Sequence, residues 1–182
     1  MLENLRYGTY DSDASPVSSV IKDADLFNVL ERLPKGLQTK LGEGGSLVSG
    51  GEGQRVRLGR GMQRPGARLA ILDEPFRGLD RGKRRELLTR TRQHWQNTTL
   101  IFISHDIEET MKFERVLVIE RGQLLENDSP EKLIENPDSR YRSLLESEME
   151  VREGMWENAE WRRLWLEGGT VVENKQEGKS FQ

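Results

Sequence analysis

Apolar residues recur at helical spacing in two stretches of the first third of the chain. In residues 17–33 they fall three or four positions apart, which predicts a helix that Pro34 ends. A second helical pattern covers residues 53–62. Residues 1–20 are rich in Ser, Asp and Gly and are expected to be loop-like, up to the first turn of that helix. The glycine-rich residues 36–51 are not expected to hold a long regular element.

Two short, wholly apolar runs follow, and both are bounded by polar residues. Residues 69–72 read LAIL and end at Asp73 and Glu74, whereas residues 100–103 read LIFI and end at Ser104 and His105. Such runs are typical of strands that are buried on both faces of a parallel sheet. Residues 82–96 between them have an amphipathic helical pattern, so the order strand, helix, strand predicts an α/β fold.

The C-terminal third repeats this alternation and then becomes highly charged. A short helix is expected at 107–112, then two strands at 116–120 and 123–126 joined by a tight turn, and then a helix that Ser129 begins. The stretch from Arg140 to Glu167 is charged and helix-prone, and the last dozen residues are polar and expected to be disordered. Three tryptophans mark this tail: Trp156, Trp161 and Trp165.

Composition narrows the class of protein. The 182 residues carry a formal net charge of −3, which argues against a chain whose main task is to coat nucleic acid. There is no cysteine, so disulfides, thiolate metal sites and cysteine nucleophiles are excluded. No apolar run approaches the roughly 18 residues that a membrane span needs. Work at a membrane would therefore require another polypeptide to do the spanning.

Three groups of residues could carry chemistry. Ser49, Gly50 and Gly51 precede a predicted helix, where bare backbone N–H groups could face a phosphate. Asp73 could hold Mg²⁺ and Glu74 could activate a water, because both follow a buried strand. His105 follows the next strand, and ligands in α/β sheets gather at the carboxyl ends of strands. Each group alone also fits an ordinary loop, two solvated acids or a structural histidine.

The order of these groups is more specific than any one of them. VSGGEGQR at 48–55 is followed by LAILDEP at 69–75, GLD at 78–80 and IFISHD at 101–106. This set resembles the ATP-binding cassette (ABC) ATPase family, in which the pieces are the signature motif, the Walker B strand, the D-loop and the switch histidine. Val48 replaces the usual Leu, and Glu52 stands where Gln is common. TKLGEGG at 39–45 is similar to the loop before the signature in ABC exporters.

The resemblance implies a fold and a division of the chain. The fold class would be α/β, a partial P-loop NTPase-like (ABC ATPase) parallel-sheet core with a helical subdomain and a C-terminal helical extension. Residues 1–66 would be the helical subdomain with the signature motif, 67–137 part of the ATPase core, and 138–182 a helical extension and disordered tail.

The resemblance also implies roles for individual residues. Glu74 and His105 would be catalytic, and Asp73 would bind Mg²⁺. ATP held on a second cassette of a dimer would be contacted by a cofactor-binding set: Ser49, Gly50, Gly51, Gln54 and Asp80. The partners would be an ABC transmembrane subunit or domain and the second cassette, with no nucleic acid. The chain would be cytoplasmic and peripheral to the membrane through its partner.

Three elements of the family pattern are missing. No G-x-x-x-x-G-K-[ST] sequence, the Walker A loop, lies before Ser49, and the tail residues 178–180 only imitate its end. The Q-loop glutamine and the adenine-stacking aromatic residue are also lacking. We therefore expect an N-terminally truncated cassette that binds ATP poorly alone and leaves strand edges and apolar surface open.

Three functions fit the sequence. The first is an ATP-binding and ATP-hydrolysing segment of an ABC transporter. The second is a non-catalytic cassette remnant that offers its signature face to another cassette. The third is half of a DNA-repair or chromosome-maintenance ABC ATPase, although no long coiled coil precedes the signature. A basic cluster at 77–92 could contact nucleic acid or anionic lipid, or could be a solvated helix face.

Overall fold

The computed structural model describes residues 1–9, 14–42, 46–64, 66–157, 164–167 and 170–173, with side chains up to residue 152. The contacts divide the chain into two units, Met1–Glu114 and Arg115–Gln182. The motifs in the sequence divide the chain after residues 66 and 137, without reference to contacts. That division stays a prediction. None of the helices in the described ranges is long and apolar enough to cross a membrane.

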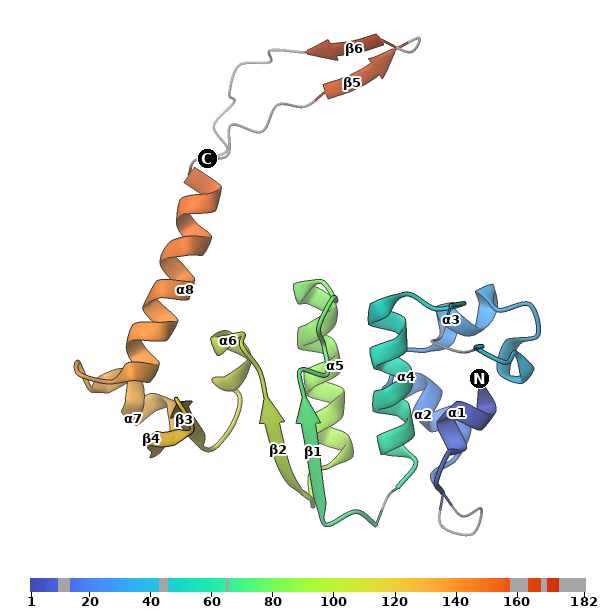
Figure 1. Cartoon of the computed structure of the whole chain (residues 1–182), viewed down its shortest axis with the longest axis horizontal. Helices are drawn as coiled ribbons and strands as arrows, with labels where there is room; N and C mark the ends of the chain where they lie inside the picture. Colours follow the sequence, from blue (N-terminus) through green and yellow to red (C-terminus); the bar gives the residue numbers. More distant parts are fainter. Residues whose placement is uncertain (10–13, 43–45, 65, 158–163, 168–169, 174–182) are drawn as a thin grey trace. The chain divides into compact units, whose positions relative to one another are not determined.

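The first unit begins with short helices that pack on a longer one (Figure 1). These elements are α1 (Leu2–Arg6), α2 (Val17–Asp23), α3 (Phe27–Arg32), the 3₁₀ turn η1 (Gly36–Gln38) and α4 (Gly50–Met62). Gly59 of α4 makes the packing close, because a Cβ there would lie 3.0 Å from Leu5 of α1 and 3.2 Å from Val20 of α2. Residues 2–6 were expected to be a loop, but burial of Leu5 against α4 stabilises a turn of helix there.

The helix predicted over residues 17–33 is two helices. Asp25 lies between α2 and α3 with a φ of 54°, in the left-handed region that no α-helix continues through. Two cations hold this break. Arg55 donates to the carbonyl oxygen of Asp25 and, at 2.7 Å, to its carboxylate, which Lys83 also contacts at 2.9 Å. Periodicity alone does not reveal these distant partners.

A β–α–β segment completes the first unit. It consists of β1 (Leu69–Asp73), α5 (Arg81–His94) and β2 (Thr99–Ile103), followed by the short α6 (Ile107–Thr110). The two strands are parallel, with Leu69 opposite Thr99 and Asp73 opposite Ile103. The strand, helix, strand order predicted from the sequence is thus what the structure has.

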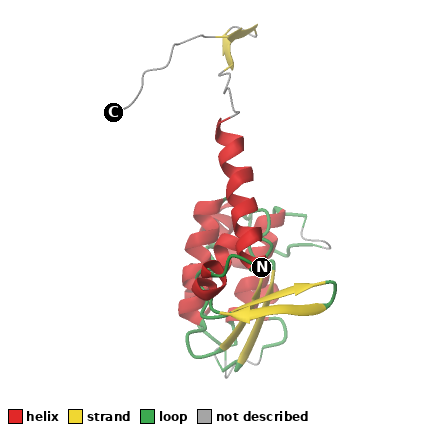
Figure 2. Cartoon of the chain, turned by 90° about the vertical axis from the view of Figure 1, so that its left-hand side faces the viewer, coloured by secondary structure: helices red, strands yellow, loops and turns green. Residues whose placement is uncertain are grey.

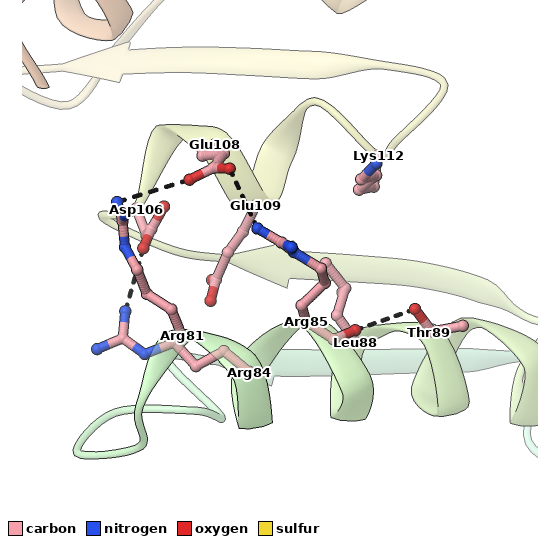
Figure 3. A pocket seen from close by; sticks show the side chains of 9 residues that line it. All are labelled: Arg81, Arg84, Arg85, Leu88, Thr89, Asp106, Glu108, Glu109 and Lys112. Atoms are coloured by element: carbon pink, nitrogen blue, oxygen red, sulfur yellow. Dashed lines mark hydrogen bonds and ion pairs between the residues drawn. The ribbon is translucent and has the colours of Figure 1, made fainter. Parts of the chain in front are cut away.

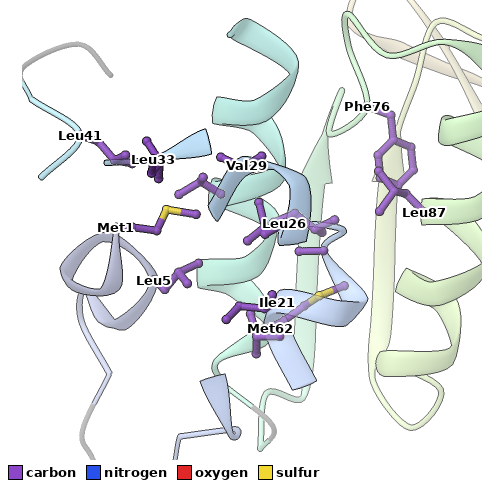
Figure 4. Close-up of a cluster of buried hydrophobic side chains, with 14 of the residues drawn as sticks. Met1, Leu5, Ile21, Leu26, Val29, Leu33, Leu41, Met62, Phe76 and Leu87 are labelled. Carbon is purple, nitrogen blue, oxygen red and sulfur yellow. The ribbon is translucent and has the colours of Figure 1, made fainter. Parts of the chain in front are cut away.

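Among the described residues, the apolar core covers one face of this two-stranded sheet. The apolar core packs against Ala70 and Leu72 of β1 and against Leu100 and Phe102 of β2. Figure 4 shows part of this core, which contains buried side chains from every helix between α1 and α5: Leu5, Ile21, Leu26, Val29, Leu33, Met62 and Leu87 among them.

The other face of the sheet is open and apolar. Its side chains are 44–60% exposed: Leu69, Ile71, Ile101 and Ile103. The expectation that both strands are buried on both faces is therefore wrong for the described chain. The expectation of open apolar surface, drawn from the missing part of the family pattern, agrees with the structure.

In the second unit, the described residues form a hairpin, two helices and a further pair of strands. β3 (Val116–Glu120) and β4 (Gln123–Asp128) are antiparallel, as predicted. Arg121 and Gly122 between them both have positive φ, which is the signature of a tight hairpin turn. The helices α7 (Pro130–Glu135) and α8 (Arg140–Glu157) follow, and Figure 2 shows α8 as one long continuous helix. Ser129 caps α7, as the sequence indicated.

Beyond α8 the chain departs from the predicted helical tail. β5 (Leu164–Glu167) and β6 (Thr170–Glu173) form an antiparallel pair. Trp165 is therefore in a strand and shares no helix face with Trp161, which lies outside the described residues. β6 also occupies the beginning of the segment that was expected to be disordered. In the sequence, a Gly-Gly dipeptide separates the two strands, which is a hairpin signal that competes with the helical pattern.

Candidate functional site

The ends of β1 and β2 bring two of the predicted site residues together. His105 Nδ1 lies 3.2 Å from Glu74 Oε1. Because β1 and β2 are parallel neighbours in register, the residues that follow each strand meet at the same edge of the sheet. The imidazole is 66% exposed and the carboxylate 35% exposed, so both are accessible to a ligand. Their catalytic role stays a prediction.

The backbone at Glu74 has an unusual conformation. Its φ is 43°, a left-handed conformation that is uncommon for a residue other than glycine. The Glu74 N–H donates to the Ile103 carbonyl oxygen at 2.9 Å, and Arg77 N–H donates to the Glu74 carbonyl oxygen at 3.2 Å. The Arg77 guanidinium lies 3.6 Å from Glu74 Oε2. Strain of this kind is commonly found at functional sites.

Asp73 occupies the last position of β1 and is exposed. The described residues contain no group of three or more acidic or histidine side chains that could enclose a metal ion. A single exposed carboxylate nevertheless suits Mg²⁺, which is usually held by one or two carboxylates together with water and nucleotide phosphates. The carboxylate of Asp73 therefore fits Mg²⁺ that a nucleotide brings with it.

The signature segment forms the N-terminus of α4. Ser49 is the N-cap, with its Oγ accepting from Glu52 N–H at 3.3 Å, and Glu52 Oε2 accepts from Ser49 N–H at 2.7 Å. This reciprocal pair is a capping box. It starts the helix at Gly50, three residues before the periodic pattern predicted. Ser49 and Gly50 are exposed, so the start of α4 is open to a ligand.

Glu52 is held in this position by a second partner. Arg32 of α3 contacts both carboxylate oxygens of Glu52 at 2.6 Å. Burial disfavours the charged carboxylate, but the hydrogen bonds from Ser49 and Arg32 outweigh it and lower the pKa of Glu52. Glu52, which departs from the usual family pattern, is thus paired with the guanidinium of Arg32 in the same chain.

Two further predicted cofactor-binding residues have local partners. Gln54 is half-buried in α4, and its Oε1 accepts from Arg57 at 3.0 Å. Asp80 is the N-cap of α5, with Oδ1 accepting from Lys83 N–H at 3.0 Å. Capping explains why an aspartate suits position 80 without any ligand. Contact of Gln54 and Asp80 with nucleotide stays a prediction.

Glu74 and His105 border a small hollow of ≈ 10 Å³, which has room for about one water molecule. Sequence reasoning missed several residues that share its lining: Phe76, Arg77, Arg84, Ser104 and Glu109. Glu109 Oε2 accepts from the Ser104 hydroxyl at 2.7 Å, and burial is the main cause that raises the pKa of Glu109. The only signal for this carboxylate in the sequence was its place in a short helix after His105.

A second hollow of ≈ 60 Å³ lies between α5 and α6 (Figure 3). Its charged residues are paired: Arg81 and Arg85 lie 3.6 and 3.7 Å from Glu108, and Arg84 lies 3.1 Å from Asp106. Arg77, Lys83, Arg90 and Arg92 of the basic cluster also contact carboxylates. This pairing favours the interpretation of residues 77–92 as a charged helix surface rather than a nucleic-acid site.

Comparison with known proteins gives one consistent group. No family model matches the chain. It is 34% identical over 146 residues to a glutathione/L-cysteine transport system ATP-binding/permease protein, CydC, of Haemophilus influenzae, covering 79% of this chain and 25% of that protein. It is 31% identical over 169 residues to the mitochondrial iron-sulfur clusters transporter ATM1 of Candida albicans, covering 88% and 22%.

Two further matches agree with these. An ATP-dependent lipid A-core flippase of Alcanivorax borkumensis is 33% identical over 133 residues, or 72% of this chain and 23% of that protein. A solved bacterial Atm1-family ABC exporter with ATP bound matches with a TM-score of 0.72 and 28% identity, over 81% of this chain and 26% of that one. The chain thus spans about a quarter of the length of the proteins it matches. Taken with the order and geometry of the motifs described above, these matches show that the chain belongs to the ATP-binding cassettes of the ABC-exporter family.

Proposed function

We propose that this chain supplies one part of an ATP-hydrolysing site that energises transport by an ABC exporter. The observation that carries the proposal is the contact between Glu74 and His105 at the ends of two parallel strands, together with the exposed N-terminus of α4. A carboxylate that can activate water, an imidazole that can contact a phosphate and a helix N-terminus that can face an anion are groups that suit phosphoryl transfer to water.

The side chains would divide the work as follows. Glu74 would accept a hydrogen bond from the attacking water and orient it. His105, with Nδ1 turned to Glu74, would contact the terminal phosphate through its other ring nitrogen. Asp73 would help hold Mg²⁺, which when bound neutralises charge on the phosphates. Ser49, Gly50, Gly51, Gln54 and Asp80 would contact the nucleotide of a second cassette.

The site would be completed by another cassette segment. The hollow beside Glu74 and His105 is far too small for a nucleotide, and the sequence has no Walker A loop to hold the β- and γ-phosphates. A second cassette segment with that loop would therefore carry ATP to these residues. A membrane-spanning partner would couple the reaction to transport, and the chain would then lie at the cytoplasmic face of a membrane.

A non-catalytic role is the second candidate. The same small hollow and the accessible Ser49 cap also suit a module that presents only its signature face to ATP bound elsewhere. The two candidates differ in whether Glu74 of this chain takes part in hydrolysis. The third function considered, in DNA repair or chromosome maintenance, has no support from the matches described above, which are a transport system protein, a transporter and a flippase.

The test is reconstitution with an exporter cassette that has a Walker A loop but whose own signature serine and Walker B glutamate have been replaced. Nucleotide binding and ATP hydrolysis are measured for each chain alone and for the mixture. Hydrolysis only in the mixture supports the first candidate. ATP binding that is tighter in the mixture than by the partner cassette alone, without hydrolysis, supports the second. A stable complex with no hydrolysis and no change in ATP affinity would exclude both.

A further inference from the structure

Arg84 contacts two loops, the 78–80 turn and the 104–106 turn. The proposed function assigns residues of both loops to the same site. Its Nε–H donates to the carbonyl oxygen of Leu79 at 2.8 Å, and its NH1 donates to Asp106 Oδ2 at 3.1 Å. The side chain of Arg84 is 23% exposed and that of Asp106 13% exposed, so this contact is largely shielded from water. Figure 3 shows Arg84 reaching from α5 to Asp106. Shielding makes such a charge-assisted pair stronger than one at the surface.

At one end, this connection reaches the N-terminus of α4. A Cβ built on Gly51 would lie 2.7 Å from Leu79 Cδ2 and 3.3 Å from the Gly78 carbonyl oxygen, so the start of α4 packs directly on the 78–80 turn. A Cβ on the adjacent Gly50 would meet nothing within 4 Å. Any shift at Gly51 must therefore push on Leu79, whose carbonyl group Arg84 holds.

At the other end, the connection reaches the candidate catalytic pair. Asp106 is the residue after His105, and its N–H donates to the Ser104 hydroxyl at 3.1 Å. The position of Asp106 thus fixes the turn that presents the His105 ring to Glu74, 3.2 Å away. The other carboxylate oxygen of Asp106, Oδ1, is buried and has no hydrogen-bond partner among the described residues. The contact with Arg84 is therefore important for holding this carboxylate in place.

We propose that Arg84 is a positioning residue within one chain. It links the 78–80 turn, on which the start of α4 packs, to the His105–Glu74 pair. The inference rests on the proposed function for the roles of the 78–80 turn and the His105–Glu74 pair. The contacts of Arg84 with Leu79 and Asp106 are observed independently of that function. Its two donors are separate nitrogens of one rigid guanidinium, which lets a single side chain hold both loops. A lysine would keep the charge next to Asp106 but would place only one nitrogen between the two acceptors.

The neighbouring Arg85 provides a matched control. It lies on the same helix, its side chain is 72% exposed, and it pairs with Glu108 at 3.7 Å. Replacing Arg85 by lysine changes the same type of residue by the same chemistry without touching Leu79 or Asp106.

The experiment uses imidazole NMR signals of the full chain without nucleotide. The sequence has two histidines, so His105 reports on the site while His94, which lies 3.5 Å from Asp23, serves as an internal reference. Gly51→Ala and Gly50→Ala are each made in the parent chain and in chains that carry Arg84→Lys or Arg85→Lys. The His105 signal of each variant is compared at one fixed pH.

We expect Gly51→Ala to shift the His105 signal in the parent and in Arg85→Lys, whereas Gly50→Ala does not. In Arg84→Lys the shift should fall to less than half, and the His94 signal should stay in place throughout. An equal shift with and without Arg84 would overturn the proposal, as would no shift from Gly51→Ala in the parent. Should Gly51→Ala fail to fold, Leu79→Ala removes the same contact from the other side and is scored in the same way. Because no ATP is present, the result does not depend on whether the proposed ATPase function holds.

Discussion

The imidazole of His105 and the carboxylate of Glu74 lie 3.2 Å apart although they follow different strands. The parallel register of β1 and β2 produces this contact, and the left-handed backbone at Glu74 directs the carboxylate toward it. The two side chains therefore form one unit, and replacing either should alter what the other can do.

Glu74→Gln should abolish most hydrolysis in the reconstituted complex while leaving ATP binding intact. A glutamine keeps the shape of the side chain but cannot act as a base, and general-base catalysis contributes about 10²–10⁴-fold to a rate. Steady-state ATPase rates and nucleotide affinity are measured on the same preparation. Glu108→Gln, on the nearby α6, serves as the control. A Glu74→Gln complex as fast as the parent would show that this chain's carboxylate is not the base.

Ser49→Ala should destabilise the first unit by about 1 kcal/mol, because α4 loses its N-cap hydrogen bond. Ser49→Thr should recover most of this loss, since threonine is also a favourable N-cap. Urea unfolding followed by circular dichroism gives the free energies of unfolding. Ser46→Ala, at an exposed position before the helix, is the control and should change little.

The capping box should weaken in acid because the folded-state pKa of Glu52 is lowered. A carboxyl group with a lowered pKa stabilises the fold fully above its unfolded-state pKa, about 4.3, and the contribution disappears as the pH falls through the folded-state value. Glu52→Gln should remove this part of the pH dependence. The free energy of unfolding measured between neutral and acid pH should therefore converge for the two proteins at low pH. Parallel curves would contradict the assignment.

Glu109→Gln should change the pH dependence of stability in the opposite sense to Glu52→Gln. Burial, opposed by the Ser104 hydrogen bond, raises the pKa of Glu109, so its ionised form is unfavourable in the folded chain. The resulting loss of stability begins as the pH rises past the unfolded-state pKa and is complete above the folded-state pKa. Glutamine mimics the protonated group, so the variant should be more stable than the parent near neutral pH and similar to it in acid. Greater stability of the parent at neutral pH would refute this.

The open face of the β1–β2 sheet should make the isolated chain associate with itself. Ile71 and Ile101 are 60% and 44% exposed on that face. Ile71→Thr combined with Ile101→Thr should reduce association, because threonine suits a strand but presents a polar group to water. Sedimentation velocity over a range of concentrations measures the effect. The exposed Met149 of α8 offers a control, Met149→Thr, which should leave association unchanged if the sheet face is responsible.

Local sequence patterns predicted the elements of the β–α–β segment and the 116–128 hairpin well. Both depend on short-range signals, namely apolar runs, N-caps and a glycine turn. That Glu74 and His105 lie at the same edge of the sheet also follows from the sequence, because it needs only two adjacent parallel strands, whereas the left-handed backbone at Glu74 could not be predicted. What could not be predicted depends on partners far away in the chain.

Arg84 is the clearest example of this limit. Its neighbours Leu79 and Asp106 come together only after the strands pair, so in the sequence it was one of several arginines in a charged stretch. The break at Asp25 has the same origin, since Arg55 and Lys83 hold it from other helices. The covered and open faces of the sheet also could not be told apart, because an apolar run reads the same whichever side is buried.

The left-handed backbone at Glu74 restricts how this position can change over evolutionary time. Residues branched at Cβ, such as valine, isoleucine and threonine, fit a φ of 43° poorly, whereas glycine, asparagine and aspartate accept it readily. Descendants of this chain freed from selection for hydrolysis would therefore drift toward that small group first. A homologue with glycine or asparagine here would keep the shape of the loop and lose only its chemistry.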